Sequence, residues 1–100
     1  MDRNGYSESL IYQDGCIVCH GRGQLVRHEV YHGAYRSKAK RLGCWVKVCP
    51  ACHYAIHNTD GRLDRQLKEM MQREAMKAYG WDTEEFIHVF GKNYIEKEIG

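Results

Sequence analysis

The segment Cys49–His57 contains two different metal-ligand spacings within nine residues. Cys49 and Cys52 form a C-x2-C pair, which is half of a common structural zinc site. His53 and His57 are four residues apart, so in a helix they lie on one face and can bind one ion together. Because successive helical residues are rotated by about 100°, Cys52 and His53 point to different sides. The segment can therefore contribute to a thiolate site and to a separate imidazole site.

A second C-x2-C pair lies upstream, and 29 residues separate the two pairs. We predict that one tetrahedral zinc ion is bound by all four thiolates, those of Cys16, Cys19, Cys49 and Cys52. Disulfide bonds are one alternative, which an oxidising compartment would favour. A second alternative is a site of two cysteines and two histidines, namely Cys16, Cys19, His53 and His57. That site leaves one C-x2-C pair unused, and its gap exceeds the roughly 12–15 residues of zinc fingers.

Two residues close to these ligands receive a different interpretation. Cys44 is the fifth cysteine and is expected to be a small buried apolar residue. His20 directly follows Cys19, and we expect it to be exposed to solvent, with metal binding as the alternative.

His28 lies between the two cysteine pairs and, with His53 and His57, predicts a second metal site. The alternative is that these are ordinary histidines near a zinc ribbon. An open site with three protein ligands can polarise a phosphoryl oxygen during hydrolysis, with Mg²⁺, Mn²⁺ or Zn²⁺ as the ion. Hydrolysis also requires a base to activate water. Glu29 is adjacent to His28 but points to the opposite face of an ideal strand, so only a distorted strand would bring both to one phosphate.

Composition indicates a single domain over residues 1–100 with a modest apolar core. A core this small suggests that bound metal supplies much of the folding free energy. The first nine residues are polar, and no segment approaches the about 20 apolar residues of a membrane span. We therefore expect a cytoplasmic protein that has no membrane partner and keeps its cysteines reduced.

The net charge of +2 is unevenly distributed along the chain. Six cations and a single acid lie between positions 27 and 47, and the cations are Arg27, Arg36, Lys38, Lys40, Arg41 and Lys47. A charged run is often only a solvated surface. Because this one lies between two metal half-sites, we predict that it forms a track for phosphate groups, as in nucleic-acid binding.

The sequence pattern predicts an α+β fold. Strands are expected over 24–31 and 44–48, joined by a basic loop over 32–43 with one helical turn around 37–41. Helices are expected over 50–58, over 62–79, and after Asp82 as N-cap up to Gly91. These elements divide the chain into a zinc-bound core at 14–58 and a helical extension at 62–95.

The order of these features resembles that of a known nuclease family. The pair His28-Glu29 precedes an aromatic residue and a basic loop with Gly33 and Arg36. An apolar strand then leads into Cys-Pro-x-x-His at 49–53, and Phe-Gly-Lys-Asn-Tyr follows at 90–94. Over residues 14–95 the chain resembles the HNH (His-Me finger) endonucleases, in particular the short type encoded by phages and prophages.

This resemblance implies a small zinc-stabilised ββα-metal core with C-terminal helices, in which His28, His53 and His57 bind the catalytic ion. Glu29 stands where many members have a general-base histidine, so Glu29, His32 or His28 is expected to be the base. The family's middle Asn would fall near Cys44, where this chain has none.

The implied activity is metal-dependent hydrolysis of DNA phosphodiester bonds, leaving 5′-phosphate and 3′-hydroxyl ends. The implied setting is the cytoplasm of a bacterial host, with phage recombination or DNA-processing proteins as partners. The alternative function is a catalytically inactive zinc-ribbon module that binds nucleic acid or protein.

Overall fold

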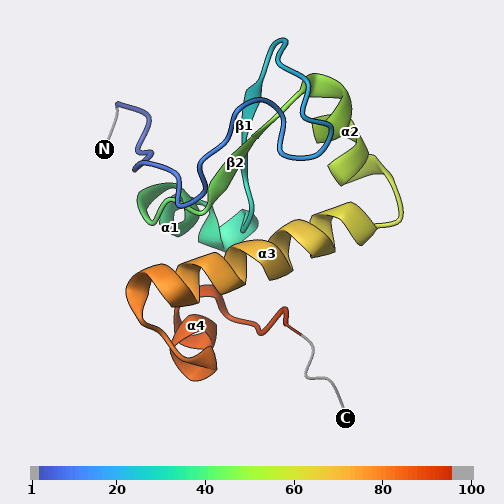
Figure 1. The fold of residues 1–100 in the computed structure, drawn as a ribbon. Helices are drawn as coiled ribbons and strands as arrows, with labels where there is room; N and C mark the ends of the chain where they lie inside the picture. Colours follow the sequence, from blue (N-terminus) through green and yellow to red (C-terminus); the bar gives the residue numbers. More distant parts are fainter. Residues whose placement is uncertain (1–2, 96–100) are drawn as a thin grey trace.

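A β-hairpin followed by helices forms the computed structural model, which describes residues 3–95 (Figure 1). Strands β1 (Val26–Glu29) and β2 (Trp45–Val48) pair antiparallel, with Val26 opposite Val48 and Glu29 opposite Trp45. The elements that connect or follow the strands are η1 (Gly33–Tyr35), α1 (Arg36–Arg41), α2 (Pro50–Asn58), α3 (Arg62–Tyr79) and α4 (Thr83–Phe90). The predicted α+β class is therefore confirmed.

The helices after the hairpin follow the signals in the sequence. Helices α2 and α3 have the predicted bounds, with Pro50 in the first turn of α2 and the left-handed Gly80 after α3. Asp82 is the N-cap of α4, and Glu85 N donates to its Oδ1 at 2.8 Å. Each boundary is set by a residue with a strong local preference, which explains why these predictions are correct.

Strand β1 is shorter than the predicted strand over 24–31, and the predicted loop over 32–43 contains two helical segments. Val30 and Tyr31 leave the strand and become fully buried in the core. Their apolar character therefore reflects burial rather than pairing in a sheet.

The core lies between the hairpin and the two C-terminal helices. Tyr31 contacts Phe86 and Phe90 of α4, with ring centroids 5.5 and 4.4 Å apart. From α3, Leu67, Met71 and Ala75 are buried at helical spacing, as expected for a core-facing stripe. In Figure 1, α3 crosses below the hairpin and α4 lies beneath α3. The buried aromatic cluster therefore joins the chain after β1 to α4.

The segment before the hairpin packs along β2 without forming a strand. Leu10 N donates to Gly43 O at 2.9 Å, and the Trp45 indole donates to Ser7 O at 2.8 Å. Gln13 holds Lys47 from both sides, since its amide donates to Lys47 O and its Oε1 accepts from Lys47 N. These contacts bring the first cysteine pair to the hairpin. Within residues 3–95, no helix has the length and apolarity needed to cross a membrane.

Candidate metal centre

The four thiols predicted to bind zinc lie together where the first cysteine turn meets the start of α2. Their sulfurs all lie within 4.8 Å of one another, and Cys19 Sγ is 3.7 Å from Cys49 Sγ. Zinc–sulfur bonds of about 2.3 Å in a tetrahedral site place two sulfurs about 3.8 Å apart. All five cysteines are free. A disulfide would require a sulfur–sulfur distance of about 2.05 Å. The cluster therefore fits a structural zinc ion.

Local backbone geometry prepares these thiols for metal binding. Gly15 has a φ of +95°, and a Cβ there would lie 2.8 Å from His20 O, so only glycine suits this tight turn. Backbone N–H groups point at the sulfurs: Val18 N is 3.4 Å from Cys16 Sγ, and Cys52 N is 3.4 Å from Cys49 Sγ. Such donors stabilise thiolate charge.

The pKa values of the clustered thiols are shifted in opposite directions. Burial disfavours the Cys16 thiolate, but backbone N–H groups outweigh burial and lower its pKa to about 6. Burial and the neighbouring thiols raise the pKa of Cys52 to about 12. Four thiols this close ionise together only around a cation, which is what a zinc ion provides.

Three histidines form a second cluster on the other side of α2. His28 comes from β1, and His53 and His57 come from α2, with candidate ligand atoms all within 4.8 Å of one another. The His28 ring centroid is 5.4 Å from that of His53 and 5.3 Å from that of His57. The cysteines and histidines are therefore divided between two clusters, which favours the four-thiolate site over the mixed alternative.

His28 has the properties of a metal ligand. It is 2% exposed, and its Nε2 is buried without a hydrogen-bond partner. Burial, followed by the nearby His57 and His53, lowers its pKa to about 4, so the ring is neutral at physiological pH. A neutral imidazole nitrogen is the form that binds a metal ion. Beside the three rings lies an open pocket of about 400 Å³.

Glu29 also lines the histidine pocket, but its carboxylate is engaged by two other side chains. Its Oε1 accepts from Tyr6 Oη and from Arg36 Nε, each at 2.8 Å. Burial opposes ionisation of this carboxyl, but the bonds from Arg36 and Tyr6 prevail and lower its pKa. A carboxylate so stabilised is a weak proton acceptor. The role of Glu29 as general base remains a prediction, and this environment does not favour it.

His32 lies at the open side of the cluster, beside a carboxylate that the sequence reading did not identify. Its ring centroid is 5.9 Å from that of His57, and its side chain is 44% exposed. His32 Nε2 is 3.6 Å from Asp64 Oδ1, in the first turn of α3. Asp64 Oδ2 is paired with Lys68 at 2.9 Å, whereas Oδ1 is buried without a hydrogen-bond partner. The only sequence signal for Asp64 is its spacing to Lys68.

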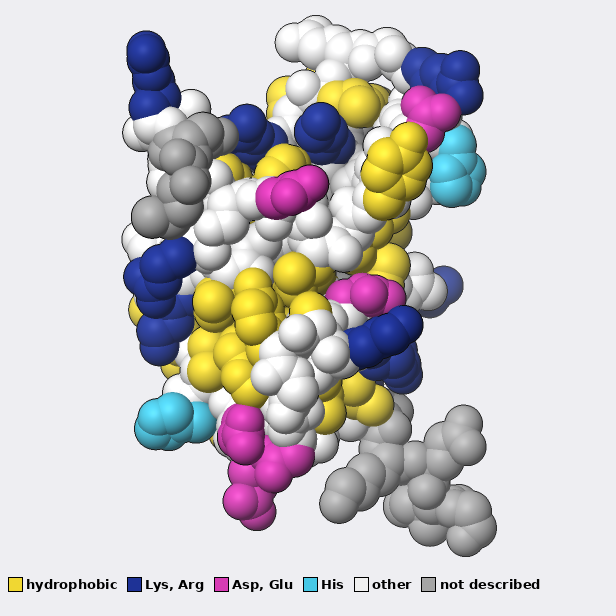
Figure 2. All heavy atoms as spheres, turned by 60° about the vertical axis from the view of Figure 1, so that its left-hand side comes forward, with side chains coloured by type: hydrophobic (Ala, Val, Ile, Leu, Met, Phe, Trp, Pro, Cys, Tyr) yellow, Lys and Arg dark blue, Asp and Glu magenta, His cyan; other side chains and the backbone are white. Residues whose placement is uncertain are grey.

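The six cations of the predicted phosphate track make different contacts. Arg27 and Arg36 line the histidine pocket, and the Arg27 guanidinium lies 4.3 Å over the Tyr6 ring. Lys38 Nζ donates to Val89 O on α4, and Lys40 Nζ donates to Asn4 O. The other two, Arg41 and Lys47, are exposed. On the face drawn in Figure 2, lysine and arginine side chains are spread over the upper part and edges, around a more apolar centre.

His20 and Cys44 lie outside both ligand clusters, as expected from the sequence. His20 is exposed and belongs to neither of the ligand clusters found within residues 3–95. Cys44 is fully buried in the core, and burial raises its thiol pKa to about 12, as expected for an apolar role.

Comparison of the chain with protein-family models, with curated proteins and with solved structures gives no match. The case for function therefore depends on the two clusters themselves.

Proposed function

We propose that this protein is a metal-dependent endonuclease of the HNH type that hydrolyses DNA phosphodiester bonds. The observation that carries the proposal is the meeting of three histidine ligands from β1 and α2 at an open pocket. The same pocket is lined by Arg27, whose charge suits a phosphate, and by Arg36, whose charge is offset by Glu29. A site with three protein ligands leaves room for substrate, as hydrolysis requires.

Each side chain has a defined part in this proposal. His28, His53 and His57 hold a divalent ion, which would polarise the scissile phosphoryl group and stabilise the leaving oxygen. Arg27 attracts and orients the DNA phosphate. Cys16, Cys19, Cys49 and Cys52 hold a structural zinc ion, so that the start of α2 stays against the hairpin that carries His28.

Among the three candidate bases, we assign His32 as the residue that accepts a proton from the attacking water. Its ring is accessible, it borders the histidine pocket, and Asp64 Oδ1 lies 3.6 Å from its Nε2. That distance is too long for a hydrogen bond, but the carboxylate would stabilise the imidazolium that forms. His28 is too buried for this role and is better used as a ligand.

A plasmid-nicking assay tests the proposal. Brief dialysis against EDTA removes the weaker ion while leaving one zinc per chain, and Mg²⁺, Mn²⁺ or Zn²⁺ is then added back. We expect nicking with at least one ion for the wild type and none for His57→Ala, the matched control that retains the thiolate site. Absence of cleavage with all three ions would reject the nuclease assignment.

The rival function is a silent zinc-ribbon module that binds nucleic acid or protein. The observation that favours it is the pairing of Glu29 with Tyr6 and Arg36, which removes a carboxylate from the family's usual base position. On this reading the histidine cluster binds an ion without turnover. The same assay separates the two functions, because the module would bind DNA or a protein but would not nick a plasmid.

A further inference from the structure

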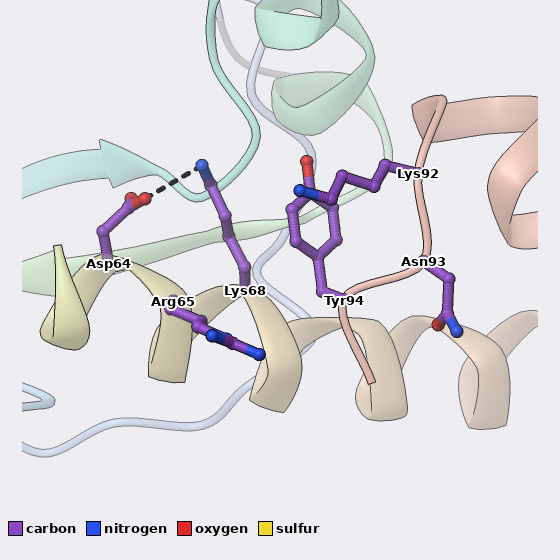
Figure 3. Close-up of a pocket in the computed structure, with 6 residues that line it drawn as sticks. All are labelled: Asp64, Arg65, Lys68, Lys92, Asn93 and Tyr94. Atoms are coloured by element: carbon purple, nitrogen blue, oxygen red, sulfur yellow. Dashed lines mark ion pairs between the residues drawn. The ribbon is translucent and has the colours of Figure 1, made fainter. Parts of the chain in front are cut away.

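An open pocket of about 420 Å³ lies between α3 and the segment that follows α4 (Figure 3). Asp64, Arg65 and Lys68 come from the first two turns of α3, and Lys92, Asn93 and Tyr94 come from the segment. In Figure 3 the Lys92 side chain lies along the Tyr94 ring, and Lys68 extends toward Asp64. Asp64 lies beside His32, which lines the histidine pocket, so Asp64 connects the two pockets.

The chain segment that forms one wall of this pocket is held by buried hydrogen bonds. Gln72 of α3 is fully buried, its Nε2 donates to Asn93 Oδ1 at 2.7 Å, and its Oε1 accepts from Tyr94 N at 2.7 Å. Tyr31, which follows β1, donates to Lys68 O at 2.7 Å, and its ring centroid is 5.4 Å from that of Tyr94. The wall is therefore fixed to the same core that positions His28 and His32.

The charges in the pocket favour an anion. The Nζ atoms of Lys68 and Lys92 lie 5.5 and 5.6 Å from the centroid of the Tyr94 ring. Three cations and one carboxylate line the pocket, so its charge attracts an anion. The Asp64 carboxylate is offset by Lys68 at 2.9 Å, and Arg65 Nε bonds Glu69 at 3.3 Å. Within residues 3–95, Lys92 has no ion pair and is the charge best suited to bind a ligand.

We propose that this pocket binds a backbone phosphate of the DNA strand whose scissile phosphate lies at the histidine site. This inference rests on the proposed nuclease function and adds a second contact point for the same substrate. His32, Asp64 and Lys68 form a continuous path from the histidine pocket to the second pocket. In this proposal an extended strand contacts Arg27 at one end and Lys92 at the other, which fixes the line that it follows across the site.

The test measures DNA binding, so it does not depend on cleavage. Zinc-loaded protein is titrated into a fluorescein-labelled 20-base-pair duplex at several salt concentrations, without any other divalent ion. The logarithm of the DNA-binding constant falls linearly with the logarithm of the salt concentration. Lys92→Gln should make this slope shallower by about 1, the expected loss for one phosphate contact. Lys92→Arg keeps the charge and should keep the wild-type slope.

Lys77→Gln is the control, because Lys77 is an exposed lysine in the last turn of α3 and lies outside the pocket. An unchanged slope for Lys92→Gln, or an equal loss for Lys77→Gln, would overturn the phosphate site. A thermal melt equal to that of wild type excludes misfolding of Lys92→Gln. If the slope falls but wild type never nicks plasmid, the pocket stands and the nuclease function fails. If wild type nicks plasmid and the slope for Lys92→Gln is unchanged, the nuclease function stands and the phosphate site fails.

Discussion

The thiolate and histidine clusters use adjacent residues of α2, Cys52 and His53, but their surroundings differ. The thiolate cluster offers four ligands, enough to complete a tetrahedral zinc site, and backbone N–H groups support its sulfurs. The histidine cluster offers three ligands beside an open pocket. Under the proposed function, one face of α2 would serve stability and another would serve chemistry. The number of protein ligands distinguishes the two roles.

Unsatisfied polar atoms sharpen the same contrast. Within residues 3–95, the buried side-chain polar atoms without a hydrogen-bond partner are His28 Nε2 and Asp64 Oδ1. Both lie around the histidine site, since Asp64 neighbours His32. Leaving a buried polar group unpaired costs about 1–3 kcal/mol, so such atoms are usually retained for a ligand or a reaction.

The largest expected effect comes from breaking the thiolate cluster. Cys49→Ser should lose bound zinc and cooperative unfolding together, because structural zinc contributes about 10–16 kcal/mol in small domains. Zinc content and thermal unfolding by circular dichroism measure the two losses. Cys44→Ala, which changes a cysteine outside the cluster, should keep its zinc. Cooperative unfolding of zinc-free Cys49→Ser would contradict the structural role.

Breaking the histidine cluster should leave the fold intact and remove activity. Changing His53 or His57 to Ala removes one of three ligands from the catalytic ion. Because such an ion supplies several kcal/mol of transition-state stabilisation, plasmid nicking should fall by roughly 10³-fold or more. Zinc bound by the thiolates should remain at one ion per chain, as measured by mass spectrometry under native conditions. Loss of both ions in His57→Ala would show that the two clusters are not independent.

Next in size is the effect of the proposed base. His32→Ala should lower the nicking rate by roughly 10²–10⁴, the usual contribution of a positioned base, while the protein still binds the catalytic ion. Glu29→Gln should have a smaller effect, because the Glu29 carboxylate already accepts from Tyr6 and Arg36. Single-turnover nicking rates rank the two variants. A larger loss for Glu29→Gln would transfer the base role to Glu29.

Local sequence signals account for much of the fold and for the residues of both the thiolate and the histidine cluster. Pro50, Gly80 and Asp82 define helix ends through their own backbone preferences, and the C-x2-C and four-residue His spacings act within one turn of chain. Strand length was wrong because Val30 and Tyr31 serve the core outside the sheet. Periodicity alone does not distinguish these two forms of burial.

Tertiary contacts explain what the sequence could not predict. Asp64 meets His32 where α3 packs beside the chain after β1, and the Tyr31 hydroxyl, which donates to Lys68 O, helps to hold α3 there. Likewise, Lys92 lines the same pocket as Lys68 because Gln72 holds the chain after α4. The basic run appeared continuous in sequence, but helix α1 directs Lys38 toward α4. Such meetings depend on packing between elements far apart in the chain, and no local pattern records them.

The smallest expected effect separates cations near the histidine site from those directed elsewhere. Arg27 lines the histidine pocket, whereas Lys38 Nζ donates to Val89 O at 3.1 Å. Arg27→Gln should therefore reduce the salt slope of DNA binding by about 1, and Lys38→Gln should change it by much less. Fluorescence anisotropy with the labelled duplex at several salt concentrations measures both slopes. A larger change for Lys38→Gln would place the DNA over α1 rather than across the histidine pocket, and would restore the basic run as the binding surface.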